Sequence, residues 1–344
     1  MPEPIHPQLG AAPHGGPGQQ AFSGLDFSVN ANPFGQNPQL LQAVLKADHA
    51  HYPDPGYLAL RESLGRWQGV AADCVVPGVG ASELLHRLVR AYLRPGEVAL
   101  SVLAPFGEFG RAVRLAGGRL EITPSGRAAE SVHLGTRLVY LGHPHNPTGR
   151  VLPPAELEAL AQACRAADAL LIVDLAYSPF LDLPSPALSS HTVLLHSPGK
   201  AHGLVGARPA YALASPAVAA ALYNLAPAWA LPAGTAALLE ALPDAQEFLH
   251  RTLPEVARNA AQLAQALSDL AEVEYHGAPY MTVRVGDAAD VAARLLARGV
   301  RVRNCASYGQ PEHLRVSARR PEENAVLVRE LSGLNLSGRP EEAK

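Results

Sequence analysis

Short apolar runs alternate with amphipathic segments along residues 75–215 of the chain. The run DCVVPGV at residues 73–79 indicates a strand, and the leucine and valine spacing in residues 81–93 is typical of a helix. The pattern then repeats. It predicts strands at 97–103, 119–123, 137–142, 169–177, 192–197 and 210–215, and helices at 108–117 and 153–168. This alternation is typical of an α/β domain with a mostly parallel sheet.

The run ALLIVDLAY at residues 169–177 contains almost no polar position. Strands of parallel sheets have this continuous apolar pattern because helices cover both of their faces. We therefore expect a central sheet flanked by helices on each side.

The periodicity changes toward the C-terminus. A long helical pattern covers residues 243–270, and strands are predicted at 280–286 and 313–319, with helices at 288–299 and 321–331. Residues 1–25 are rich in Pro, Gly and Gln and read as an extended arm. The expected organisation is an N-terminal arm (1–35), a large domain (36–240) and a smaller α+β domain (241–344).

Composition narrows the class of protein. The 344 residues are 48% hydrophobic and 17% charged, which is enough for a large core, and the net charge of −3 does not favour a nucleic-acid partner. Three scattered cysteines without CxxC spacing predict neither a disulfide framework nor a metal site. The sequence shows no apolar stretch of membrane-spanning length and no signal-peptide pattern, so a cytosolic, cytoplasmic protein is expected.

Lysine is rare in this chain. Of 28 basic residues, only Lys46, Lys200 and Lys344 are lysines. Lys200 lies in an apolar, glycine-rich stretch just after a predicted strand, a setting that lowers the pKa of an amine and makes it nucleophilic.

Other polar groups also follow predicted strands. They are the backbone amides of Gly80, Ala81 and Ser82, the amide of Asn146, the carboxylate of Asp174, the phenol of Tyr177 and the hydroxyl of Ser197. Ligands of open α/β sheets bind beyond the carboxyl ends of the strands, so these groups can converge there. An amine, a carboxylate and phosphate donors together favour pyridoxal 5′-phosphate as cofactor.

The chemistry of that cofactor assigns a role to each group. Lys200 would react with its aldehyde, and Asp174 would hold the proton of its pyridine nitrogen. Tyr177 and Asn146 could donate hydrogen bonds to its phenolic oxygen.

The cofactor phosphate needs its own donors. The amides of residues 80–82 begin a predicted helix, where anions bind well, and Ser197 and Arg208 could add a hydroxyl and a guanidinium. Phe106 could stack on the cofactor ring.

Each of these residues has a simpler explanation when taken alone. An aspartate that ends a strand is usually a turn or cap residue, and a lysine is usually solvated. NPTG is a common turn, and GVGAS is a weak phosphate signal. The joint order of these residues after successive strands is what favours a cofactor site.

The segments HPHNPTG (143–149), DLAY (174–177) and SPGKAHGLVGARPAY (197–211) resemble those of the class I/II aminotransferases, which are fold type I pyridoxal-phosphate enzymes. The resemblance implies that Lys200 binds the cofactor covalently, that Asp174 pairs with its ring nitrogen and that Arg208 binds its phosphate. It also implies a homodimer with shared active sites, in which Tyr52 of the segment YPDP reaches the neighbouring cofactor, and an arm that contributes to the small domain and the active site.

Shorter segments resemble one subfamily. HGG (14–16), DFSVNANPFG (26–35), PGVGASELL (77–85) and VRVRNCASYG (300–309) are similar to threonine-phosphate decarboxylase. This implies decarboxylation of L-threonine O-3-phosphate to aminopropanol phosphate, a step of cobalamin biosynthesis. It further implies that Arg303 and Arg315 bind the anionic groups of the substrate, with Asn32 and Asn146 nearby.

Two alternatives stay open. The first is an aminotransferase such as histidinol-phosphate aminotransferase, a family that usually carries an acidic residue where this chain has Ala31 in NANP. The second is a catalytically silent or regulatory homologue, although a regulator would normally add a DNA-binding domain. The same site residues serve decarboxylation and transamination, so sequence predicts the cofactor better than the reaction.

Overall fold

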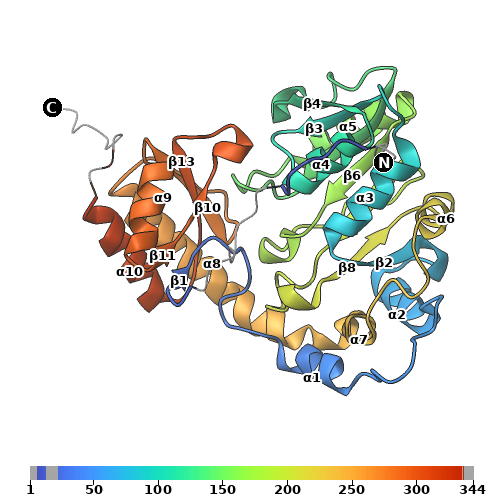
Figure 1. The fold of residues 1–344 in the computed structure, drawn as a ribbon, viewed down its shortest axis with the longest axis horizontal. Coiled ribbons are helices and arrows are strands. Elements are labelled where there is room, and N and C mark those ends of the chain that lie inside the picture. The colour runs from blue at the N-terminus through green and yellow to red at the C-terminus, as the bar shows by residue number, and fades with distance from the viewer. Residues whose placement is uncertain (1–5, 13–21, 335, 337–344) are drawn as a thin grey trace, which may run out of the picture.

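The computed structural model describes residues 6–12, 22–334 and 336 of the chain (Figure 1). A seven-stranded sheet forms the centre of the large domain, in the order β2-β8-β7-β6-β5-β3-β4. Its strands are β2 (Val75–Val79), β3 (Val98–Val102), β4 (Arg119–Thr123), β5 (Thr136–Gly142), β6 (Leu170–Asp174), β7 (Thr192–His196) and β8 (Pro209–Leu213). Only β8 runs antiparallel to its neighbours, so the prediction of a mostly parallel sheet is confirmed.

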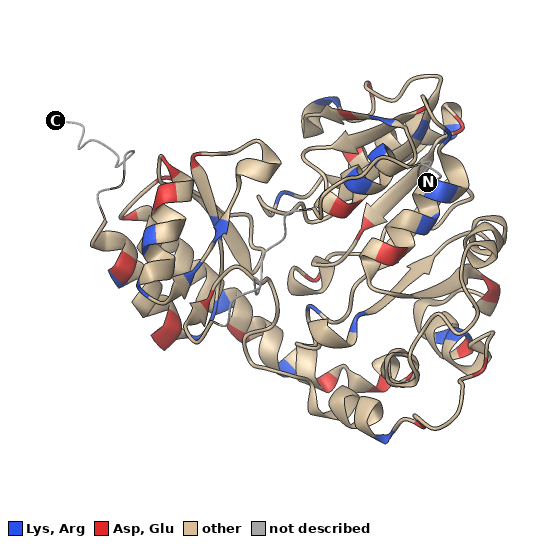
Figure 2. Ribbon diagram, viewed as in Figure 1, with Lys and Arg blue, Asp and Glu red and all other residues tan. Residues whose placement is uncertain are grey.

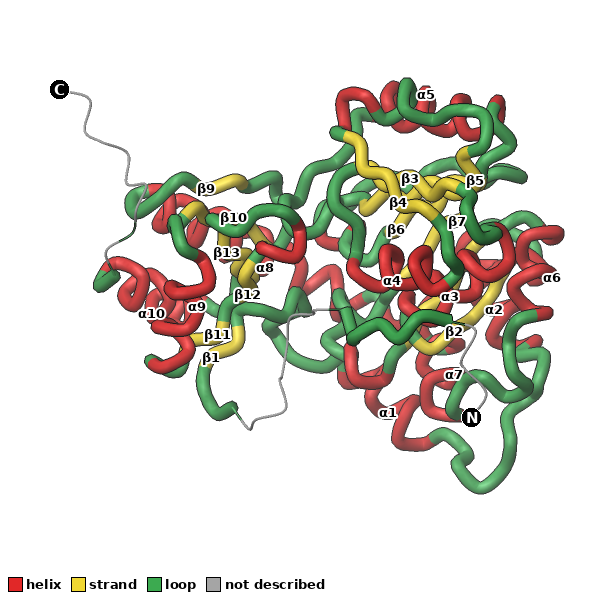
Figure 3. The backbone as a smooth tube through the Cα atoms, turned by 45° about the horizontal axis from the view of Figure 1, so that its top comes forward, coloured by secondary structure: helices red, strands yellow, loops and turns green. Residues whose placement is uncertain are grey.

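Helices cover both faces of this sheet. They are α1 (Pro38–Lys46), α2 (Leu58–Gln68), α3 (Ala81–Tyr92), α4 (Gly107–Leu115), α5 (Pro154–Ala166), α6 (Pro216–Asn224) and α7 (Ala233–Glu240). Leucines of α1, α2, α5 and α7 pack on one face, and apolar residues of α3, α4 and α6 pack on the other. Figure 3 shows α5 and α4 on opposite sides of the strands.

Strand β5 shows why apolar and polar residues do not alternate along the strands of this sheet. Val139 and Leu141 belong to the core beneath α5, whereas Leu138 and Tyr140 belong to the core beneath α3 and α4. Successive side chains of a strand point to opposite faces, so a sheet covered on both sides requires apolar residues at nearly every position.

The smaller domain contains a four-stranded antiparallel sheet in the order β12-β13-β10-β9. Its elements are α8 (Glu247–Ser268), β9 (Val273–Glu274), β10 (Tyr280–Arg284), α9 (Ala288–Ala297), β11 (Val300–Arg301), β12 (Arg303–Asn304), β13 (His313–Ser317) and α10 (Pro321–Ser332). The N-terminal part of α8 packs near Tyr177, and its C-terminal part belongs to the small-domain core. The packing of this single helix therefore joins the two domains.

The N-terminal segment contacts both domains. Strand β1 (Leu25–Asp26) pairs in parallel with β11, and residues 6–12 lie against α4, where Arg111 donates to the carbonyl of Gly10 at 3.3 Å. The HGG segment at 14–16 lies outside the described residues.

The charged residues are distributed over the helices of both domains (Figure 2). Within the described part of the chain, no helix combines the length and apolarity needed to cross a membrane.

Candidate active site

A pocket lies at the carboxyl ends of β5, β6 and β7, where the sequence predicted a cofactor. Ten predicted residues line it: Gly80, Ala81, Ser82, Phe106, Asn146, Asp174, Tyr177, Ser197, Lys200 and Arg208. The other lining residues are Ala104, Tyr140, Gly142, Pro144, His145, Ala176, Gly199, Val205 and Pro209. Groups separated by more than a hundred residues of sequence therefore share one cavity.

The surroundings of Lys200 lower the pKa of its amine. Burial lowers its pKa to about 8, and the cations of Arg315 and Arg208 push the pKa in the same direction, while Asp174 opposes them. Its Nζ atom lies 5.9 Å from the ring centre of Tyr177. The neutral amine is the form that attacks an aldehyde, so this setting suits the predicted covalent attachment.

Asp174 ends β6 and is 8% exposed. Burial raises the pKa of this carboxyl, whereas hydrogen bonds from Tyr140 and Ala176 and the charge of Lys200 lower it. The Tyr140 hydroxyl donates to Oδ2 at 2.8 Å, and the Ala176 amide donates to Oδ1 at 3.1 Å. These hydrogen bonds stabilise the ionised form of the carboxylate, which burial has removed from solvent.

Gly80 and Arg208 form one corner of the pocket. Gly80 has φ of +87°, and a Cβ atom there would lie 2.2 Å from a guanidinium nitrogen of Arg208. Only glycine leaves room for the cation beside the first turn of α3. A helix N-terminus with an adjacent arginine and the Ser197 hydroxyl is a suitable phosphate site.

Tyr177 is buried and lines the same pocket. Its ring makes an edge contact with Tyr280, with ring centres 4.9 Å apart. Burial raises the pKa of its phenol, and Arg315 and Asn30 oppose that shift. The phenol is therefore a hydrogen-bond donor at neutral pH, as its predicted role requires.

The two predicted substrate arginines lie at different depths. Arg315, on β13, is 4% exposed and donates to Oδ1 of Asn146 at 2.6 Å and to the carbonyl of Ser28 at 2.5 Å. Arg303 is half-buried and donates to Ser307 at 2.8 Å. Neither arginine is among the residues that line the pocket, but Arg315 contacts the lining residue Asn146 and acts electrostatically on Lys200.

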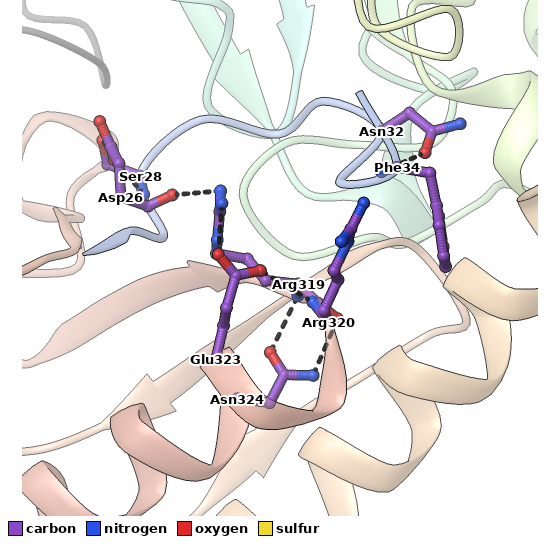
Figure 4. Close-up of polar contacts among 8 residues, drawn as sticks. All are labelled: Asp26, Ser28, Asn32, Phe34, Arg319, Arg320, Glu323 and Asn324. Carbon is purple, nitrogen blue, oxygen red and sulfur yellow. Dashed lines mark hydrogen bonds and ion pairs between the residues drawn. The ribbon is translucent and has the colours of Figure 1, made fainter. Parts of the chain in front are cut away.

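Asn32 lies next to the Lys200 loop, where its backbone amide donates to the carbonyl of Lys200 at 2.9 Å. Its Nδ2 atom donates to the carbonyl of Ala201 at 2.9 Å and to the hydroxyl of Thr252 at 2.8 Å, and its Oδ1 atom accepts from the amide of Phe34 (Figure 4). Both donors of this amide are used within the protein. Asn32 thus joins the arm, the Lys200 loop and α8, and the prediction of a substrate contact gains no support.

Figure 4 also shows how the arm is attached to the small domain. Arg319 donates to the carbonyl of Asp26 at 3.1 Å and pairs with Glu323 at 2.8 Å. The guanidinium of Arg320 lies 5.7 Å from the ring centre of Phe34. These contacts position the segment that carries Asn30 and Asn32.

Tyr52 does not line the pocket of its own chain. It is 78% exposed, in the loop between α1 and α2, and its ring stacks on Trp229 with centres 4.5 Å apart. Its predicted contact with a cofactor phosphate therefore needs a second subunit.

Sequence reasoning missed Tyr140, Asn30 and Tyr308. Tyr140 touches Asp174 directly, Asn30 affects the pKa of Tyr177, and Tyr308 acts electrostatically on Lys200. Strand alternation places Tyr140 on the same face of β5 as Gly142, but the pairing of Gly142 with Asp174 is visible only in the structure. Tyr308 stands in the segment RNCASYG, where only the arginine received a role.

The residues present fit pyridoxal phosphate. A buried carboxylate, an amine with a lowered pKa and an anion-binding corner surround one cavity. This is the donor set that the cofactor needs.

Comparison with known proteins agrees with this geometry. The family model for "Aminotransferase class I and II" matches residues 23–331. Histidinol-phosphate aminotransferase 1 of Thiobacillus denitrificans is 33% identical over 325 residues, covering 88% of this chain and 83% of that protein. Histidinol-phosphate aminotransferase 2 of Ralstonia nicotianae is 32% identical, covering 90% of this chain and 88% of that protein.

Solved structures have the same fold. Histidinol-phosphate aminotransferase from Sinorhizobium meliloti in complex with pyridoxal-5′-phosphate superposes with a TM-score of 0.80, at 25% identity and 88% coverage of each chain. L-threonine-O-3-phosphate decarboxylase from Porphyromonas gingivalis superposes with a TM-score of 0.79 at 20% identity, covering 89% of this chain and 98% of that one. The chain therefore belongs to the class I and II aminotransferases and is a pyridoxal-phosphate-dependent enzyme of fold type I.

Proposed function

We propose that this enzyme is an aminotransferase that moves the amino group of histidinol phosphate to a 2-oxo acid. The sequence segments, NANP among them, had favoured threonine-phosphate decarboxylase over this aminotransferase, so the order of the two candidates is reversed. The supporting observation is that curated relatives at 32–33% identity, matched over 88–90% of this chain, are histidinol-phosphate aminotransferases. The resemblance to the decarboxylase rests on short segments and on a structural match at 20% identity, which speaks for the fold alone.

The bound cofactor supplies an aldehyde and an electron-withdrawing ring. The chain supplies the rest. Lys200, with a pKa of about 8, can release and take up a proton at its Nζ atom near neutral pH. Asp174 would provide a negative charge beside the cofactor ring, and Arg208 with the amides of residues 81 and 82 would hold its phosphate.

The distribution of cations supports a phosphorylated amino substrate. Arg315 acts electrostatically on Lys200, and Arg303 lies further out beside Tyr308, with 5.8 Å between its guanidinium carbon and the ring centre. A substrate with an amine at one end and a phosphate at the other could place its amine at Lys200 and its phosphate at the arginines. Guanidinium groups bind phosphate in a bidentate manner, so these arginines would favour a phosphorylated substrate over one without an anionic group.

Decarboxylation of threonine phosphate is the second candidate. The observation in its favour is Ala31, which leaves the NANP segment without the acidic side chain usual in histidinol-phosphate aminotransferases. The two reactions differ in which bond of the substrate's α-carbon breaks. Arg303 and Arg315 would set the orientation of the substrate in both cases.

A substrate test separates the two candidates. Purified enzyme loaded with pyridoxal phosphate is given histidinol phosphate, and 2-oxoglutarate is then added. We expect the visible absorbance of the lysine-bound cofactor to disappear with the first compound and return with the second. Release of CO₂ from L-threonine O-3-phosphate, with no such cycle on histidinol phosphate, would establish the decarboxylase instead.

We also propose a homodimer in which Tyr52 completes the partner's site. Tyr52 stacks on Trp229, and Leu45 near the end of α1 and Leu58 at the start of α2 are also exposed. Sedimentation velocity should give twice the monomer mass, and Tyr52→Ala should weaken cofactor binding without changing that mass. A monomer with an intact site would refute this arrangement. The three-part division of the chain and a cytoplasmic location stay predictions.

A further inference from the structure

Tyr140 and Asp174 form a buried pair on neighbouring strands. The hydroxyl of Tyr140 donates to Oδ2 of Asp174 at 2.8 Å. In the parallel pairing of β5 and β6, Tyr140 is level with Ile172, and Gly142 is level with Asp174. Side chains at these alternate positions share one face of the sheet, so the phenol reaches the carboxylate past a glycine without a side chain.

The phenol ring is held firmly. Tyr140 is 3% exposed, and its ring stacks on Phe109 of α4 with centres 4.9 Å apart and planes inclined by 21°. A tyrosine clamped between the sheet and α4 has little rotamer freedom. Its hydroxyl therefore has a fixed position from which it orients the carboxylate.

We propose that Tyr140 is a positioning residue that fixes the orientation of the Asp174 carboxylate and keeps it a weak base toward the pyridine nitrogen of the cofactor. This role is independent of the substrate, so it holds for transamination and for decarboxylation alike. Tyr140 acts through Asp174 and takes no part as an acid or base.

The electrostatics of the pair support this role. Burial and the charge of Asp174 raise the pKa of the Tyr140 phenol well above its ordinary value, so it stays a donor throughout the working range. Its hydrogen bond in turn lowers the pKa of the Asp174 carboxyl against the effect of burial. Without that donor the carboxylate would bind a proton more tightly and draw it from the ring nitrogen. The ring would lose positive charge, and the Lys200 nitrogen bonded to the cofactor would keep its proton to a higher pH.

The test is a pH titration of the visible absorbance of the loaded enzyme. Tyr140→Phe should raise the midpoint by about one pH unit, the size expected for losing a hydrogen bond to a charged group. Tyr211→Phe is the matched control. It removes another buried phenol from the same sheet, one that accepts from Gln68 at 2.9 Å and lines no part of the cofactor pocket, so its midpoint should equal that of the wild type.

A second variant avoids any loss of packing. Replacing Tyr140 with 3-fluorotyrosine keeps the ring and strengthens the donor, so the midpoint should move in the opposite direction, to lower pH. Midpoints that coincide in wild type, Tyr140→Phe and the fluorinated protein would overturn the proposal. An equal shift in Tyr211→Phe would also overturn it, because the effect would then come from the sheet as a whole.

Discussion

Arg315 of the small domain donates a 2.6 Å hydrogen bond to Oδ1 of Asn146 in the loop after β5 of the large domain. The same guanidinium donates to the carbonyl of Ser28 on the N-terminal arm. One buried cation therefore joins three separate parts of the chain at the site where an anionic substrate is expected to bind. We therefore expect substrate binding at Arg315 to depend on the relative position of the two domains.

Replacing Arg315 should impair catalysis strongly. Arg315→Lys keeps the charge but loses the planar set of donors, and we expect kcat/KM to fall roughly 100-fold, the effect of breaking a buried charged hydrogen bond. Arg284→Ala is the control, because it removes an exposed arginine of the same small-domain sheet that pairs with Glu312. Steady-state kinetics of both variants measure the difference, and equal activity in Arg315→Lys and wild type would exclude a role in substrate binding.

Gly80→Ala should weaken cofactor binding. The added Cβ atom would lie 2.2 Å from a guanidinium nitrogen of Arg208, so the guanidinium would have to shift from its position beside the first turn of α3. We expect the Kd for pyridoxal phosphate to rise at least tenfold, about 1.4 kcal/mol. Gly69→Ala provides the control, since Gly69 also has a positive φ but a methyl group added there would have no neighbouring atom within 4 Å.

Both glycine variants carry the strain of a positive φ, but to different extents. Gly69 has the left-handed helical angles φ +69° and ψ 30°, which cost alanine about 1 kcal/mol, whereas Gly80 has φ +87° and ψ 152°, a region essentially confined to glycine. Gly80→Ala should therefore lower the melting temperature more than Gly69→Ala does, and cofactor affinity is measured separately, by fluorescence titration of the apoenzyme. The same affinity in both variants would mean that backbone strain, and not the displacement of Arg208, is responsible.

The lowered pKa of Lys200 should appear in the stability of the apoenzyme. Its folded pKa of about 8 lies below the ordinary value of 10.5, so the unfolded chain binds more protons between these values. Stability must then rise with pH across this window, because the penalty for burying the charged amine is fully present below pH 8 and is relieved above it.

A comparison with Lys200→Met isolates this effect. The variant lacks the buried amine. We therefore expect its unfolding free energy at pH 7 to exceed that of the wild type by up to roughly 3 kcal/mol, which is the free energy equivalent to the pKa difference. Urea unfolding at pH 7 and at pH 10 gives both values. The difference should shrink as the pH rises from 8 to 10, and a constant difference would show that Lys200 is not desolvated in the apoenzyme.

Asn32→Ala should affect stability more than substrate recognition. The substitution leaves the carbonyl of Ala201 and the hydroxyl of Thr252 without their amide donor, at a cost of about 1–3 kcal/mol in unfolding free energy. We expect KM for the amino substrate to change less than threefold. A large rise in KM with unchanged melting temperature would restore the direct substrate contact first expected for Asn32.

The predicted strands and helices of residues 75–215 agree with the structure to within a few residues. The run 169–177 contains β6, and the helical spacing at 81–93 contains α3. Such patterns are local, since the periodicity of a segment reflects how its own side chains meet the core. Gly80, Lys200 and Arg208 were also accessible to sequence reasoning, because they stand at recognisable spacings after strands.

Contacts between distant segments could not be predicted from the sequence pattern. The hydrogen bond between Tyr140 and Asp174 exists because β5 lies beside β6 in register, and neither residue's neighbours in sequence specify that pairing. The engagement of Asn32 with Ala201 and Thr252 likewise depends on the path of the arm across the domain boundary.

The identity of the cofactor followed from residue types and their order along the chain, since aldehyde chemistry demands an amine and a ring nitrogen demands an acid. Only the tertiary structure shows that Arg315 is buried, that Asn32 uses both of its amide donors within the protein, and that Tyr140 donates to the Asp174 carboxylate. Each of these depends on contacts between segments that are far apart in sequence. Hydrogen-bond partners and desolvation are properties of the assembled interior, where a group's neighbours come from other elements of the fold.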